Sequence, residues 1–70
     1  MVVNMLGKNI KTLRKRNGVS QVELAAAIDV YPDYLSWWES GKRLPSLNFV
    51  IAIADYFDIT LDELCRGEIK

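Results

Sequence analysis

The sequence predicts an all-α fold, in which one compact domain of five short helices spans residues 1–70. Three observations predict it: apolar residues recur at helical spacing, glycine and proline separate segments of helix length, and two Ser/Thr-x-x-Glu capping boxes mark helix starts. No run of residues favours strands, and no repeat is present. A chain this short buries only about 60% of its unfolded surface, which leaves room for one modest core and little room for an enclosed active site.

The first helix is expected to begin at Asn4, which can cap it, and to end at Gly18. Its apolar residues Leu6, Ile10 and Leu13 fall at helical spacing and predict one buried face.

The second helix is expected to begin with a capping box, in which Ser20 and Glu23 each bond the other's backbone N–H. It continues through Leu24, Ala25 and Ile28, whose spacing again predicts a buried face.

A four-residue connection, 29–32, leads into the third helix. Pro32 suits its first position, where a missing N–H has no consequence, and Gly41 suits the left-handed residue after its end. Steps of 100° per residue from Leu35 divide the helix into two faces. The inward face is expected to hold Tyr31, Leu35 and Trp38, and the outward face Asp33, Ser36, Trp37 and Ser40.

Pro45 and Ser46 open a fourth helix, and a second capping box at Thr60–Glu63 begins a short fifth helix that Gly67 ends. The fourth helix has two apolar stripes. The inward stripe is expected to be Leu47, Val50, Ile51, Ala54 and Phe57. The opposite stripe is Phe49, Ala52 and Tyr56. A helix that is apolar on both sides is normally buried on both sides. Either the fifth helix covers part of this second stripe, or the fourth and fifth helices build a homodimer interface.

Charge is distributed unevenly although the net charge is zero. Residues 1–45 carry seven basic and four acidic groups, whereas residues 46–70 carry five acidic and two basic groups. The single cysteine, Cys65, excludes an internal disulfide and is expected to be a small packed residue in a reducing compartment. No signal peptide and no membrane span are evident, so we expect a cytoplasmic protein that does not engage a membrane.

Helices two and three, at about residues 20–40, have the layout of a helix-turn-helix unit, with the small Ala25 where they cross. Residues 6–64 resemble the Cro/C1-type helix-turn-helix family, the lambda-repressor-like DNA-binding domains. The resemblance is carried, in the right order and spacing, by Ser20-Gln21-x-Glu23-Leu24-Ala25, by Val30, by Leu35-Ser36-x-Trp38-Glu39-x-Gly41-Lys42-Arg43-x-Pro45-Ser46 and by Leu61-Asp62-Glu63-Leu64.

The resemblance implies that the third helix lies in the major groove of double-stranded DNA while the second crosses the phosphate backbone. The positions that read base edges are then Pro32, Asp33, Ser36 and Trp37. Gln21 matches a residue that touches phosphate and braces the reading helix, and Lys42 and Arg43 match a loop that grips phosphates. Lys11 and Lys15 belong to a basic run that either attracts phosphate or is only a solvated helix face. The family also implies an ion pair between Arg14 and Glu39 that fixes the first helix to the third.

Three residues depart from the family pattern. Tyr31 replaces the usual serine or threonine cap of the reading helix, and the negative charge of Asp33 compensates near that terminus. Asp33 also faces a groove lined by phosphates and can accept mainly from cytosine N4. Trp37 replaces a polar or basic reader, where it can pack against a thymine methyl group or a sugar, or anchor a protein partner.

The chain has no histidine, no metal-ligand cluster and no glycine-rich phosphate loop, so we expect neither an enzyme nor a cofactor or small-molecule substrate. The leading hypothesis is a sequence-specific transcriptional regulator, a dimeric repressor that excludes polymerase from a promoter. The alternative is a protein-binding module, an antitoxin or adaptor that uses this scaffold without tight DNA binding. The base-reading residues form no simple code for an operator sequence.

Overall fold

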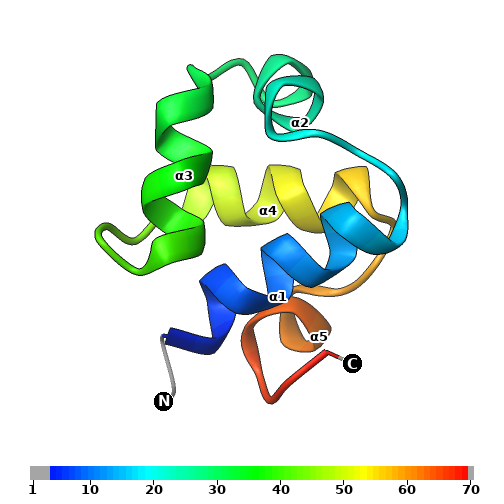
Figure 1. The fold of residues 1–70 in the computed structure, drawn as a ribbon. Helices are drawn as coiled ribbons and strands as arrows, with labels where there is room; N and C mark the ends of the chain where they lie inside the picture. The colour runs from blue at the N-terminus through cyan, green and yellow to red at the C-terminus, as the bar shows by residue number, and fades with distance from the viewer. Residues whose placement is uncertain (1–3, 70) are drawn as a thin grey trace.

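The computed structural model describes residues 4–69 and consists of helices joined by short turns (Figure 1). The helices are α1 (Asn4–Arg16), α2 (Gln21–Ala27), α3 (Pro32–Ser40), α4 (Leu47–Tyr56) and α5 (Leu61–Cys65). No strand occurs within residues 4–69, which confirms the all-α prediction. In this part of the chain, every helix is too short or too polar to cross a membrane.

The local start and stop signals act as the sequence predicts. In the first capping box the Ser20 hydroxyl accepts a bond from the Glu23 N–H at 3.0 Å, and the Ser20 N–H donates to the Glu23 carboxylate at 3.0 Å. Thr60 and Glu63 repeat both contacts at the start of α5. Gly41 follows α3 with a φ of +83°, in the left-handed region that favours glycine. The predicted cap at Asn4 concerns a side chain that lies outside the described part of the chain.

Each helix contributes one hydrophobic side chain with 0% exposure to a common core. These five residues are Ile10, Leu24, Leu35, Ile53 and Leu64. In Figure 1, α2 lies at one end of the molecule and α5 at the other, with α1 and α4 between them and α3 along one side. The core therefore ties α3 to the rest of the molecule through its inward face and leaves its other face uncovered.

The helices α1 and α3 cross at Gly7. A Cβ atom at this position would overlap the carbonyl oxygen of Trp38 and lie 3.2 Å from the Cα of Glu39. The two backbones approach this closely only because residue 7 has no side chain. The C-terminal half of α3 is thereby fixed against α1.

The segment after α5 is held by a buried asparagine on α1. The Asn9 amide donates to the carbonyls of Leu64 and Gly67, both at 2.9 Å, and its oxygen accepts from the Ile69 N–H at 2.8 Å. Both polar atoms of the buried Asn9 side chain are thus hydrogen-bonded, and their partners lie at the end of α5 and in the segment after it.

Two predictions about buried faces are wrong. Tyr31 was expected to face inward but is 76% exposed. On α4 the expected inward residues Leu47 and Ile51 are 66% and 38% exposed, while Ile53, which the prediction left out, is fully buried. The core-facing side of α4 is centred between Val50, Ile53 and Ala54. Phe49 and Ala52 are half-buried against the core rather than free, and only Tyr56 of the predicted second stripe is exposed, at 42%.

Candidate nucleic-acid interface

The turn between α2 and α3 is built without a side-chain cap. Asp29 has a φ of +62°, which reverses the chain after α2, and the Val30 N–H donates to the Ala25 carbonyl at 2.9 Å. Tyr31 is extended and makes no capping hydrogen bond, and Pro32 begins α3 as predicted. Asp33 is then the acidic residue in the first turn, where negative charge is favourable.

The uncovered face of α3 carries most of the predicted base-reading residues. Pro32, Asp33 and Ser36 are exposed, as expected, while Leu35 and Trp38 are buried. The predicted outward face is therefore correct for Asp33, Ser36 and Ser40, and the predicted inward face for Leu35 and Trp38. These side chains lie on the part of α3 that is free to meet a partner.

Trp37 differs from these residues because its indole is half-buried among its neighbours. The ring of Tyr34 packs edge-on against it, with centroids 5.3 Å apart. The guanidinium carbon of Arg43 lies 4.8 Å from the centre of the indole ring, within the range of a cation–π contact. Trp37 and Arg43 are thus in direct contact, although the sequence predicts base contact for the first and phosphate contact for the second.

The loop after α3 is hydrogen-bonded back to the same residue. The N–H groups of Lys42 and Arg43 both donate to the Trp37 carbonyl, at 2.9 and 3.4 Å. Both side chains are exposed, and neither forms an ion pair among the described residues. Two positive charges therefore stand beside the uncovered face of α3.

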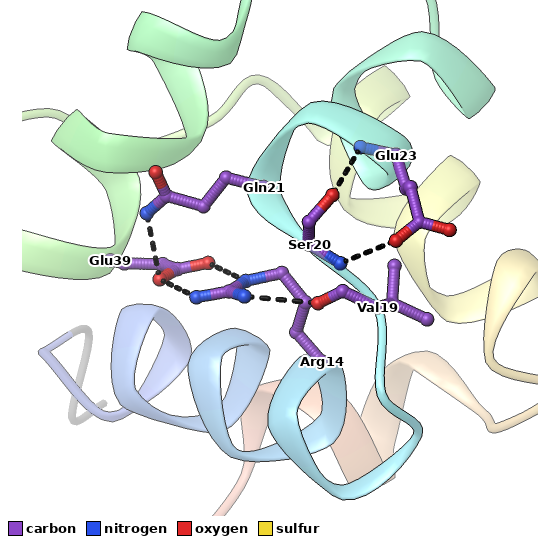
Figure 2. A network of polar contacts seen from close by, with 6 residues as sticks. All are labelled: Arg14, Val19, Ser20, Gln21, Glu23 and Glu39. Carbon is purple, nitrogen blue, oxygen red and sulfur yellow. Dashed lines mark hydrogen bonds and ion pairs between the residues drawn. The ribbon is translucent and has the colours of Figure 1, made fainter.

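The predicted ion pair between Arg14 and Glu39 is present and bidentate (Figure 2). Arg14 Nε and Nη2 donate to the two carboxylate oxygens at 2.8 and 2.9 Å, and Nη1 donates to the Val19 carbonyl at 3.0 Å. The Gln21 amide donates to the same carboxylate at 3.1 Å. The hydrogen bond to Glu39 raises the pKa of Arg14 above its ordinary value. Glu39 therefore joins the start of α2, the end of α3 and α1.

The basic residues of α1 differ in their surroundings. Lys11 and Lys15 are exposed, whereas Lys8 pairs with Glu68 at 2.6 Å.

Away from this surface, burial raises the pKa of the Cys65 thiol, which keeps it protonated at neutral pH and agrees with a packed residue.

An open groove lies beside the turn, with a volume of about 500 Å³. Its lining residues are Ala26, Asp29, Val30, Tyr31, Tyr34 and Phe49. Sequence reasoning missed this groove because it placed Tyr31 in the core. The signal that could have revealed it is a pair of tyrosines spaced by three residues around the helix start.

Residues 10–64 match the family model of the helix-turn-helix proteins. The chain belongs to the helix-turn-helix family. Its fold and its motifs agree with the Cro/C1-type resemblance that the sequence indicates.

Among helix-turn-helix relatives, the transcriptional activator BcrR of Enterococcus faecalis is 34% identical over 61 residues, which are 87% of this chain and 30% of the activator. The antitoxin PezA of Streptococcus pneumoniae is 34% identical over 66 residues, which are 94% of this chain and 41% of the antitoxin. The chain thus spans less than half the length of each of these two relatives. The N-terminal DNA-binding domain of SinR from Bacillus subtilis superimposes with a TM-score of 0.85 at 31% identity and covers 96% of this chain and 99% of that domain.

Proposed function

We propose that this helix-turn-helix protein is a sequence-specific DNA-binding transcriptional regulator. The observation that carries the proposal is the uncovered face of α3, which the Glu39 network and the crossing at Gly7 hold in a fixed position. Similarity to the SinR DNA-binding domain over nearly the whole chain supports it.

In the proposed complex α3 enters the major groove and α2 crosses the phosphate backbone. The resemblance assigns base contact to Pro32, Asp33, Ser36 and Trp37, and the side chains of the first three are exposed. Asp33 can accept from cytosine N4, Ser36 can donate or accept, and the apolar atoms of Pro32 can pack against a thymine methyl group. Gln21, Lys42, Arg43, Lys11 and Lys15 contact phosphates and set register and affinity rather than sequence choice.

We further propose that the protein is cytoplasmic and binds DNA as a homodimer. It represses transcription by excluding polymerase from a promoter. A two-fold dimer places two copies of α3 one helical turn of DNA apart, about 34 Å, so the operator is expected to be palindromic. A reporter promoter carrying the selected operator should lose activity when the protein is supplied. Increased activity would show an activator instead.

The decisive experiment is selection of duplexes from a random-sequence pool, followed by titration of the selected duplex at several salt concentrations. Four cationic side chains on phosphates give a slope of log affinity against log salt of about −3.6 per protomer. Affinity per protomer should therefore fall roughly 100-fold between 50 and 200 mM salt. Failure to enrich any duplex, or a flat salt dependence, contradicts the proposal.

Two variants separate phosphate contacts from base contacts. Lys42→Ala should weaken binding to all duplexes and reduce the salt slope by about one. Ser36→Ala should instead relax sequence preference at one position and leave the salt slope unchanged. Both side chains are exposed, so neither change should alter the stability of the fold.

The alternative function, a protein-binding module, is favoured by the open groove at the turn and by the zero net charge. Two tyrosines in that groove, Tyr31 and Tyr34, are of the residue type enriched at binding hot spots. PezA, an antitoxin, is a relative of this chain. This alternative replaces the regulator if the selection enriches no duplex.

A further inference from the structure

We propose that Trp37 is a positioning residue for Arg43: the indole holds the guanidinium beside α3, where it contacts a DNA phosphate. This inference rests on the proposed DNA-binding function and deepens it. It gives the unusual tryptophan on the reading helix a role that is independent of base sequence.

The indole is itself held by aromatic contacts that reach the core. Tyr34 packs edge-on against Trp37, and its ring centroid is also 6.0 Å from that of Trp38. Trp38 is 4% exposed and packs against Phe49 with centroids 5.4 Å apart. A continuous series of rings therefore fixes Trp37 to the core, and one face of its indole is covered by the Arg43 guanidinium.

Arg43 is consequently restrained at both ends. Its backbone N–H donates to the Trp37 carbonyl, and its guanidinium lies over the Trp37 ring. An exposed arginine normally loses rotamer freedom when it binds, and restraint before binding reduces that loss. Lys42 lies next to it in the same loop, and its ammonium group does not lie over an aromatic ring of the described residues, which makes it a matched internal control.

The geometry of a guanidinium allows both contacts at once. Its flat face stacks on an aromatic ring, while its N–H groups point outward in the plane and can donate to phosphate oxygens. Lysine lacks this division between face and edge. A guanidinium stacked on the Trp37 ring in this way keeps its donors available to DNA.

The inference makes a prediction that separates it from base reading by Trp37. A tryptophan that packs against a thymine methyl group would affect only duplexes that carry thymine at that position. A tryptophan that positions a phosphate-binding arginine affects all duplexes equally, and its removal has no further effect once Arg43 is absent.

The test is a double-mutant cycle with Trp37→Ala, Arg43→Ala and the combined variant. Each is titrated at low salt against the duplex recovered by selection and against an unrelated duplex of the same length. Trp37→Ala should weaken binding to both duplexes by about three- to five-fold. The combined variant should bind no more weakly than Arg43→Ala alone. The same cycle with Lys42→Ala in place of Arg43→Ala should be additive.

Arg43→Lys is the second arm, because it leaves the aromatic cluster intact and so retains the fold even if Trp37→Ala does not. It should lose affinity for both duplexes to a similar extent as Trp37→Ala, although the charge is unchanged. Additive losses in the Arg43 cycle, a loss confined to the selected duplex, or full affinity of Arg43→Lys overturns the inference while the regulator function stands. If the unaltered protein binds no duplex, both fail together.

Discussion

At the scale of single residues, Glu39 connects three helices next to the proposed DNA interface. Its carboxylate is 4% exposed and accepts bonds from Arg14 on α1 and from Gln21 at the start of α2. Because a buried carboxylate is stable only when paired and hydrogen-bonded, this arrangement fixes the end of α3 at a unique position. The position of α3 thus depends on a residue that faces away from the proposed DNA.

Glu39→Ala should lower the free energy of unfolding by about 3 kcal/mol, because it leaves the nearly buried guanidinium of Arg14 without its partner. Urea denaturation monitored by circular dichroism measures the change. The total stability of a domain of this size is on the order of 3–10 kcal/mol, so a large fraction of it would be lost.

The matched control replaces both partners, as Arg14→Met with Glu39→Leu. Removing the pair together leaves no unpaired buried charge, so the double variant should recover more than half of the stability that Glu39→Ala loses. If Glu39→Ala changes stability by less than about 0.5 kcal/mol, the ion pair does not stabilise the domain.

At the scale of helices, the crossing of α1 and α3 depends on Gly7. A methyl group there would overlap the Trp38 carbonyl, so the α3 backbone must move away from α1. Glycine inside a helix is normally unfavourable by about 1 kcal/mol relative to alanine. The close approach of two backbones is the physical reason why it is present.

Gly7→Ala is therefore expected to destabilise the domain by about 1–3 kcal/mol, in spite of the better helix propensity of alanine. Lys11→Ala on the exposed side of the same helix is the control and should change stability by less than about 0.5 kcal/mol. Thermal melting of the two variants measures the difference. A Gly7→Ala variant as stable as the control would mean that α1 and α3 do not cross at this residue.

Helix boundaries could be predicted from the sequence, whereas helix faces could be predicted only in part. The caps at Ser20, Thr60 and Gly41 are local interactions within a few residues, so the sequence contains all that determines them. Tyr31 was misplaced because, as the residue before α3, it has φ −73° and ψ 147° and lies outside the 100° spacing of the helix. The face of α4 was misjudged because apolar residues surround that helix, and only packing decides which of them face inward.

The candidate site shows the same division. The Arg14–Glu39 pair and the exposed residues of α3 follow from motif and helical spacing. The contact between Trp37 and Arg43 depends on how the chain turns back after Gly41, with two N–H groups bonded to one carbonyl. Residues six apart across a loop have no periodic relation, so no sequence pattern indicates this contact.

At the scale of the whole molecule, size and surface bear on assembly. The molecule measures 27 × 24 × 20 Å, so two copies in contact across a two-fold axis can place equivalent helices one turn of DNA apart, about 34 Å. Leu47 and Ile51, one helical turn apart on α4, are both exposed, at 66% and 38%, whereas Tyr56 is the exposed member of the predicted stripe of Phe49, Ala52 and Tyr56. We therefore place the proposed dimer interface on the Leu47 side of α4.

Charge substitutions on the two sides of α4 locate this interface. Leu47→Lys buries a charge in the proposed interface and should convert the dimer to a monomer in sedimentation experiments. It should also weaken binding to a palindromic operator on the order of 100-fold, because the two half-sites are no longer bound by two linked protomers. Tyr56→Lys is the matched control and should leave the dimer intact, since Tyr56 packs on Phe57 of its own chain, with ring centroids 5.0 Å apart. Monomers from Tyr56→Lys alone would place the interface on the originally predicted stripe. Monomers in the unaltered protein at the concentrations that bind DNA would exclude a preformed dimer.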